Sequence, residues 1–385
     1  VFDIAESLAR AKAVNAFISA EEFLKIRKTL STTSEVKDFF RMNDEDEPSP
    51  YPHLSVEATD LEPLPALARA IDRVMDQYGN IRDNASAELA SIRSELARIS
   101  GAANAILRRV MAKAVSDGIL EADATPSVRD GRLVIPVPPM NKRRIQGIVH
   151  DQSASGKTYF IEPAEVVEVN NRQRQLQLDE QREIARILTQ LTSELRPEIM
   201  FLTTNGEILG WFDFVLAKAR YAVETGGMLP QLTDGPELEW YHAVHPVLLE
   251  SLRSKGKDVV PLDIHLTEKE RILVISGPNA GGKSVCLKTA GILQYMLQSG
   301  VLPPAYENSR FGIFDSIFID IGDDQSILDD LSTYSSHLRN MRFFLRNSGK
   351  DTLVLIDEFG AGTEPQIGAA MAQAILASLN ETGVW

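Results

Sequence analysis

The sequence predicts a multidomain protein of mixed α and α/β class: long helical arms with a small β-rich tip, followed by an α/β domain with a mainly parallel sheet. Three observations predict this architecture. Apolar residues recur at helical spacing through residues 1–116 and again over 164–223. Between these stretches the period shortens to that of strands, and from about residue 236 strand-like and helix-like segments alternate.

Composition limits the class of protein. With 385 residues, 44% of them hydrophobic and 24% charged, the chain is neither disordered nor collagen-like. Its single cysteine excludes an intramolecular disulfide and a multi-cysteine zinc site, and fits a cytoplasmic protein. No run of 18 apolar residues occurs, so we expect no membrane partner. The net charge of −14 by itself disfavours a nucleic-acid partner.

The first third reads as helix. Apolar spacing predicts helices over Ala5–Phe17 and Ala20–Leu30, and Ser19, ahead of two glutamates, suits an N-terminal cap of the second. The acidic, proline-rich stretch Asn43–Tyr51 is typical of a solvated surface loop.

Two long helical patterns flank the β-rich tip. Ala85–Met111 would span roughly 40 Å as a helix, and Ala164 to about Leu195 returns as a second arm that Pro197 ends. This layout indicates a hairpin arm. The short segments between the arms, predicted to be strands, are Arg132–Val137, Gln146–His150 and Thr158–Ile161.

The tip is basic within an acidic chain. Residues 128–160 hold six cations against two anions, which suits a phosphate backbone, although a solvated basic turn is the alternative. The candidate nucleic-acid residues are Arg132, Lys142, Arg143, Arg144 and Lys157.

The strongest motif is a complete G-x-x-x-x-G-K-[ST] phosphate-binding loop. An apolar segment, Arg271–Ser276, precedes it as a predicted buried strand, and an amphipathic pattern over Lys283–Gln298 follows as a predicted helix. Backbone N–H groups would surround the phosphates, Lys283 would reach the β- and γ-phosphates, and the Ser284 hydroxyl would ligate Mg²⁺. The loop consists of Gly277, Pro278, Asn279, Ala280, Gly281, Gly282, Lys283 and Ser284.

A second motif supplies carboxylates. The apolar run that begins at Thr352 ends in Asp357 and Glu358, so a buried strand would deliver both to its C-terminal edge beside the loop. Asp357 would hold Mg²⁺, and Glu358 would polarise the attacking water.

The segment between these motifs holds further candidates. Gln325 lies where ATPases of the ABC type carry a glutamine that senses Mg²⁺ and the γ-phosphate. Hydroxyl residues at a helix start can bind a phosphate or merely cap the helix; here they are Ser332, Thr333, Ser335 and Ser336. His245, before the α/β core, would contact the nucleotide base or cap a turn.

Together these motifs resemble the ATPase domain of the MutS family. The segments are GPNAGGKS (277–284), DIGDDQS (320–326), LSTYSSH (331–337) and DEFGAGT (357–363). Within the family the chain is most similar to the MutS-two, recombination-suppressor branch, through GIVHDQSASGKTYFIEP at 147–163 and through Val285, where mismatch-repair members commonly carry Thr. The resemblance covers nearly the whole chain.

The resemblance implies a division into domains. Residues 1–116 would form a helical core and first lever arm, 117–163 the clamp tip, 164–228 the returning arm and a core helix, and 229–385 an ABC-type ATPase domain. Because the chain begins at Val1 and stops at Trp385, we expect a fragment without the branch's C-terminal nuclease domain or the family's switch histidine.

The resemblance also implies a Mg²⁺-dependent ATPase that works as a head-to-head homodimer. The ATP-binding set would be Gly277–Val285 with His245, and the Ser332–Ser336 segment would contact the partner subunit's γ-phosphate. The nucleic acid would be branched recombination-intermediate DNA, with suppression of homologous recombination and a relation to DNA repair. A ribosome-associated rescue factor that contacts rRNA is the alternative, and an SMC-like structural ATPase is a third.

Net charge then becomes consistent with a nucleic-acid partner. The six cations of the tip oppose its two anions, whereas residues 271–385 hold eight cations against twelve anions. The binding surface would be a small basic tip on an acidic body.

Overall fold

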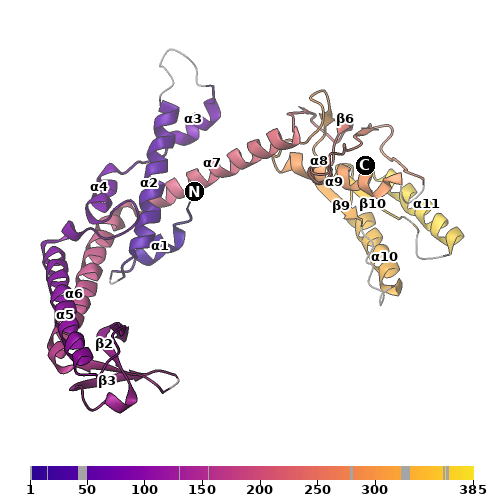
Figure 1. Ribbon diagram of the computed structural model, residues 1–385. Helices are drawn as coiled ribbons and strands as arrows, with labels where there is room; N and C mark the ends of the chain where they lie inside the picture. The colour runs from indigo at the N-terminus through magenta and orange to yellow at the C-terminus, as the bar shows by residue number, and fades with distance from the viewer. Residues whose placement is uncertain are drawn as a thin grey trace. The chain divides into compact units, whose positions relative to one another are not determined.

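The computed structural model describes residues 2–14, 16–41, 50–129, 131–154, 156–277, 281–321, 330–358, 360 and 364–385, with the side chains of 330–335 left out. The chain divides into two compact units, Val1–Trp211 and Phe212–Trp385 (Figure 1). Helix α7 (Ile199–Thr225) contains the boundary between them. No helix in the described ranges is both long enough and apolar enough to cross a bilayer.

The body of the first unit is helical, as the sequence predicts. Its helix bounds are α1 (Ala5–Ala11), α2 (Ala20–Arg41), α3 (Pro52–Thr59) and α4 (Pro65–Val74). Ser19 and Glu22 form a reciprocal capping box at the start of α2, because each side chain accepts from the other residue's backbone N–H. Helix α1 ends earlier than predicted and α2 continues further. The predicted loop Asn43–Tyr51 lies mostly outside the described residues.

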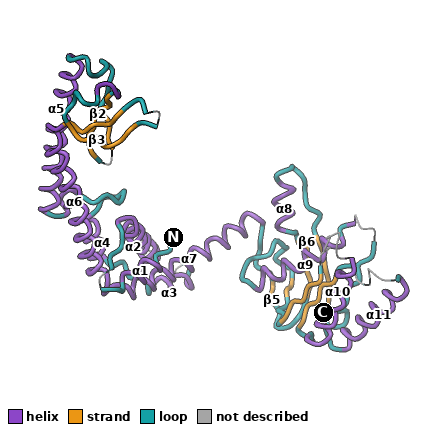
Figure 2. The backbone as a smooth tube through the Cα atoms, turned by 90° about the horizontal axis from the view of Figure 1, so that it is seen from below, coloured by secondary structure: helices purple, strands orange, loops and turns teal. Residues whose placement is uncertain are grey.

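Helices α5 (Ala87–Ser116) and α6 (Ala164–Leu195) form the predicted hairpin arm and run side by side in both views (Figures 1 and 2). Their antiparallel pairing is fixed by polar contacts along the seam. Ser86 caps α5 by accepting from the Leu89 N–H at 3.0 Å and also donates to the buried Glu183 at 2.6 Å. Arg93 and Glu180 form an ion pair at 2.7 Å.

A four-stranded antiparallel sheet lies at the far end of the arm, where its strands are orange in Figure 2. Strand order is β1-β2-β4-β3, so β3 is an edge strand. The core beneath the sheet includes Leu107, Ile135 and Ile161 and joins it to α5. The strand bounds are β1 (Ser127–Arg129), β2 (Arg132–Val137), β3 (Gly147–Gln152) and β4 (Tyr159–Pro163).

The described residues of the second unit form two sheets. Parallel strands β9 (Ser316–Asp320) and β10 (Thr352–Ile356) form one. The other is mixed: its order is β5-β8-β6-β7, and β6 pairs antiparallel with both neighbours. The prediction of a mainly parallel sheet therefore holds for β9 and β10 but not for the four-stranded sheet. The bounds in the latter are β5 (Gln231–Leu232), β6 (Leu238–Ala243), β7 (Leu262–Leu266) and β8 (Arg310–Phe311).

Four helices complete the described part of this unit: α8 (Pro246–Arg253), α9 (Lys283–Gln298), α10 (Asp330–Asn347) and α11 (Pro365–Glu381). Helix α9 packs closely against β10. A Cβ built on Gly291 of α9 would lie 2.9 Å from the Leu355 Cδ1 atom, so glycine permits this approach.

The prediction of a buried strand over Arg271–Ser276 was wrong. The segment has no strand assignment, and Leu273 and Val274 are 52% and 71% exposed. A strand requires a neighbour that accepts and donates backbone hydrogen bonds, and none of the described residues pairs with this segment in a ladder. The apolar pattern thus indicated a preference for the extended conformation, but it could not show whether a neighbouring strand pairs with the segment.

Candidate functional site

The described part of the glycine-rich loop has the geometry of a helix start. Gly282 is the N-cap of α9 with a φ of 85°, a left-handed conformation that favours glycine. The Lys283 ammonium donates to the Gly277 carbonyl at the other end of the loop, so it lies over the loop. Pro278, Asn279 and Ala280 lie outside the described residues, and Val285 is a half-exposed residue in the first turn of α9.

Asp357 and Glu358 follow β10 directly, as the sequence predicts. The Asp357 N–H donates to the Asp320 carbonyl at 2.9 Å, and the Asp357 carboxylate accepts from the Glu358 N–H at 3.0 Å. Glu358 has a φ of 50°, which is uncommon for a residue with a side chain and costs roughly 1–3 kcal/mol. This strained turn directs two carboxylates out of the strand end.

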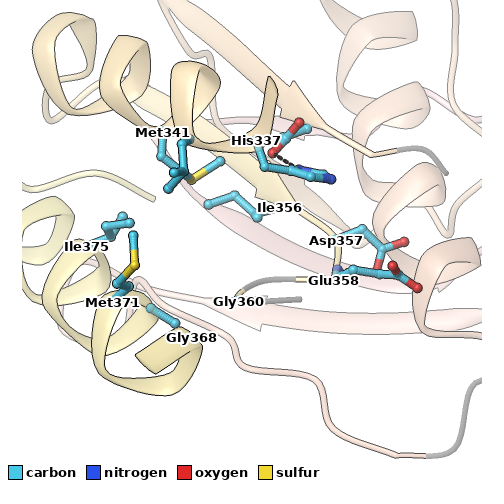
Figure 3. Close-up of a pocket in the computed structure, with 12 residues that line it drawn as sticks. His337, Met341, Ile356, Asp357, Glu358, Gly360, Gly368, Met371 and Ile375 are labelled. Atoms are coloured by element: carbon cyan, nitrogen blue, oxygen red, sulfur yellow. Dashed lines mark hydrogen bonds and ion pairs between the residues drawn. The ribbon is translucent and has the colours of Figure 1, made fainter. Parts of the chain in front are cut away.

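A hydrogen-bonded cluster that the sequence did not predict adjoins these carboxylates. The buried Asp320 carboxylate accepts from His337 Nδ1 at 2.7 Å and from Asn340 Nδ2 at 2.9 Å. Asp320, His337, Asp357 and Glu358 line part of a small cavity of about 30 Å³, which is enough room for a water molecule (Figure 3). The sequence offered one weak signal for this cluster: Asp320 ends an apolar segment, and His337 follows later in the chain.

Several predicted residues cannot be compared with the structure. Gln325 lies outside the described residues, as do the side chains of Ser332, Thr333 and Ser335, whereas Ser336 is half-buried in α10. His245 takes the capping role that its sequence position allowed, because its Nδ1 accepts from the Leu248 N–H at 3.4 Å at the start of α8. Burial, helped by nearby Lys288, lowers the pKa of His245.

The donor chemistry of this site fits Mg²⁺. A serine hydroxyl, Ser284, and a carboxylate, Asp357, are oxygen ligands of the kind that Mg²⁺ takes beside phosphates and water. Ser284 is the second residue of α9, and Asp357 directly follows β10.

Arg132 in the tip is bound inward and is not a free surface cation. Its guanidinium donates to both oxygens of the fully buried Glu162, at 2.8 and 3.1 Å. The same carboxylate lies 2.5 Å from His150 Nε2 and accepts from Asn170 Nδ2 at 2.7 Å. Glu162 therefore joins β2, β3, β4 and α6.

The environment of Glu162 keeps its carboxylate ionised. Burial alone would raise its pKa, but hydrogen bonds from Asn170, His150 and Arg132 outweigh burial and lower it. The sequence contained a signal for this hub, since Glu162 is the only charged residue of the otherwise apolar strand β4, in the string 147–163.

The other tip cations lie nearer the surface. The Lys142 ammonium lies 4.1 Å from the Tyr159 ring centroid, and Arg144 donates to the Asp117 carbonyl at 3.0 Å. Arg143 and Lys157 are exposed, and neither side chain has a partner among the described residues. These surface cations thus lie in the segment before β3 and in the connection between β3 and β4.

Comparison with known proteins adds independent observations. Residues 273–383 match the family MutS domain V. The Endonuclease MutS2 of Geobacillus sp. (strain WCH70) is 42% identical over 383 residues, which are 100% of this chain and 48% of that protein. The Endonuclease MutS2 of Pelotomaculum thermopropionicum is 41% identical over 381 residues, 99% of this chain and 47% of that protein. The chain spans about half the length of the curated relatives it matches.

Proposed function

We propose, since the chain belongs to the MutS2 branch of the MutS family, that it is an ATP-hydrolysing nucleic-acid clamp. The observation that supports this most directly is the pairing, in one unit, of a glycine-rich loop that opens α9 with two carboxylates at the end of β10. The word endonuclease in the relatives' names applies to those proteins. The proposal for this chain is confined to ATP hydrolysis and nucleic-acid binding.

Each residue of the site has a role in phosphoryl transfer to water. Backbone N–H groups of the loop and the N-terminus of α9 hold the phosphates, and Lys283 neutralises charge on the β- and γ-phosphates. Ser284 and Asp357 hold Mg²⁺, which neutralises charge that develops on the phosphate oxygens. Glu358 orients and polarises the attacking water, a role that suits its position at the strained end of β10.

Long helical arms would connect the ATPase domain to the clamp and transmit its movements. Residues 1–116 and 164–228 supply the helical core and arms, 117–163 the clamp, and 229–385 an ABC-type ATPase domain with Gln325 as its γ-phosphate sensor. Two chains would meet head to head, with the Ser332–Ser336 segment of one against the ATP of the other. Closure of the ATPase domains would then change the grip of the clamp tip.

The clamp tip would bind the phosphate backbone of the nucleic acid. Lys142, Arg143, Arg144 and Lys157 carry the surface cations, whereas Arg132 organises the tip through Glu162. Branched recombination-intermediate DNA is the proposed ligand, with suppression of homologous recombination in the cytoplasm as the biological result.

The first test concerns ATP. Lys283→Ala should abolish ATP binding, while Lys288→Ala, an exposed lysine further along the same helix, should retain it. Calorimetric titration with ATP and Mg²⁺ measures both variants. Binding of ATP to Lys283→Ala with the affinity of the unchanged protein would overturn the assignment of the loop.

The second test concerns the nucleic acid. Affinity for four-way-junction DNA, for linear duplex and for purified disomes should be compared over a salt titration. Preference for the junction at every salt concentration supports recombination DNA. Preference for disomes would instead favour a ribosome-rescue role, and equal, strongly salt-dependent affinities would leave only nonspecific phosphate binding.

A further inference from the structure

The buried residue Asp320, at the end of β9, connects three elements of the second unit: β9, the residue after β10, and α10. Its backbone carbonyl accepts from the Asp357 N–H at 2.9 Å, so it fixes the residue that follows β10. Its side chain, only 8% exposed, accepts from His337 Nδ1 at 2.7 Å and from Asn340 Nδ2 at 2.9 Å, and both belong to α10. We refer to Asp320, His337 and Asn340 as the Asp320 cluster.

The cluster sets the position of α10 relative to the candidate catalytic carboxylates. His337 and Asn340 are three residues apart on α10, so both face Asp320 from successive positions on one side of the helix. Because a rotation or a shift of α10 along its axis would separate at least one donor from a buried acceptor, the two bonds fix both its angle and its height. Figure 3 shows the His337 ring and the Asp357 and Glu358 carboxylates bordering the same pocket.

The segment that would face a partner chain comes directly before His337. Ser332–Ser336 occupies the first turns of α10, and its backbone is therefore carried by the helix that Asp320 holds. Asp320 is thus bonded on one side to Asp357, the proposed Mg²⁺ ligand of the same chain. On the other side it is bonded to α10, which carries the segment that would contact the ATP of the partner chain.

We propose that the Asp320 cluster is a positioning element that couples a chain's own nucleotide site to its partner's. Asp320 transmits the position of Asp357 to α10, and His337 and Asn340 are positioning residues that present Ser332–Ser336 to the second ATP. The proposal rests on the function proposed above, because it requires an ATP-dependent dimer. It assigns a role to residues that contact neither phosphate nor metal in the proposed mechanism.

The test is the full-length protein with His337→Ala, and His265→Ala, an exposed histidine of β7, as its control. Loss of one hydrogen bond to a charged group should weaken ATP-dependent dimerisation about tenfold, which is ~1.4 kcal/mol. The kcat for ATP hydrolysis should fall by a similar factor at an unchanged KM and an unchanged affinity of the single chain for ATP. His265→Ala should change none of these quantities.

Rescue separates positioning from simple packing. In His337→Asn the amide nitrogen takes the place of Nδ1, so dimerisation and kcat should recover, whereas His337→Gln should behave as His337→Ala. Asp320→Asn and Asn340→Ala should each lower dimerisation and kcat without loss of ATP binding, and thermal melts report whether a variant folds. Asn340→Ala removes one bond only, so it remains informative where Asp320→Asn does not fold.

Three results would overturn the coupling role. One is wild-type dimerisation and kcat in both His337→Ala and Asn340→Ala. Another is loss of single-chain ATP affinity equal to the loss of kcat, which would assign the cluster to nucleotide binding. The third is no recovery in His337→Asn. Failure of the proposed function itself is seen separately, since the unchanged protein would then neither bind ATP nor dimerise with it.

Discussion

Replacement of Glu162 tests the interior of the clamp tip. Glu162→Ala removes the acceptor of Arg132, His150 and Asn170 from a site with no solvent exposure. Removal of one partner from a buried ion pair costs about 3–5 kcal/mol. The Arg132 side chain is 20% exposed and would keep its hydrogen bond to Asn171, so we expect a cost at the lower end of that range. Glu162→Gln keeps the shape and one acceptor oxygen, so its cost should be smaller, about 1–3 kcal/mol.

The assay must report on the tip alone. The three tryptophans, at 211, 240 and 385, all lie outside it, so tryptophan fluorescence would miss the change. Hydrogen exchange of peptides covering 132–163 measures the free energy of opening at the tip directly. Glu168→Gln, an exposed glutamate of α6, is the matched control and should leave exchange unchanged.

The same residue predicts a dependence on pH. Since the pKa of Glu162 is lowered by folding, its contribution is complete above the pKa of the unfolded chain, about 4.3, and is lost as the pH falls toward the folded value. Protection at the tip should therefore fall on acidification below about pH 4.5, and less so in Glu162→Gln. If Glu162→Ala lowers the free energy of opening at the tip by less than about 1 kcal/mol, the proposed role of Glu162 is refuted.

Three further changes test other parts of the chain. Ser86→Ala removes a helix cap and should lower the unfolding free energy by about 1–2 kcal/mol in thermal melts; an unchanged Tm would contradict the capping role. Gly291→Val should cost about 1–3 kcal/mol through contact with Leu355, whereas Gly210→Ala, with open space around it, should not destabilise; equal Tm values would argue against the close packing of α9. Glu358→Gln should slow ATP hydrolysis by about 10²–10⁴-fold with ATP binding retained, and unchanged turnover would remove Glu358 from catalysis.

Periodicity was sufficient for the elements that bury one regular face. Helices Ala164–Leu195 and Lys283–Gln298 and strand Arg132–Val137 have the predicted bounds. In each, local pattern and tertiary packing agree, so the sequence alone determines the element. The capping box at Ser19 follows from local chemistry in the same way.

Pairing and buried charge could not be predicted in this manner. The apolar run Arg271–Ser276 has strand propensity, but a strand also depends on a neighbour elsewhere in the chain. The position of Glu162 and Asp320 in apolar strands was a weak signal, but it did not predict their burial, because that depends on donors from other elements, such as Asn170 on α6 and His337 on α10. Arg132 was predicted as a surface contact for the same reason.

The most direct test of the central claim is whether nucleotide controls nucleic-acid binding. Affinity for four-way-junction DNA should be measured for the full-length protein with Mg²⁺, with and without a non-hydrolysable ATP analogue, beside Lys283→Ala. We expect the analogue to change the affinity of the unchanged protein by about tenfold or more, ~1.4 kcal/mol of coupling, and to leave Lys283→Ala unaffected. An affinity that is the same with and without the analogue in the unchanged protein would contradict an ATP-operated clamp.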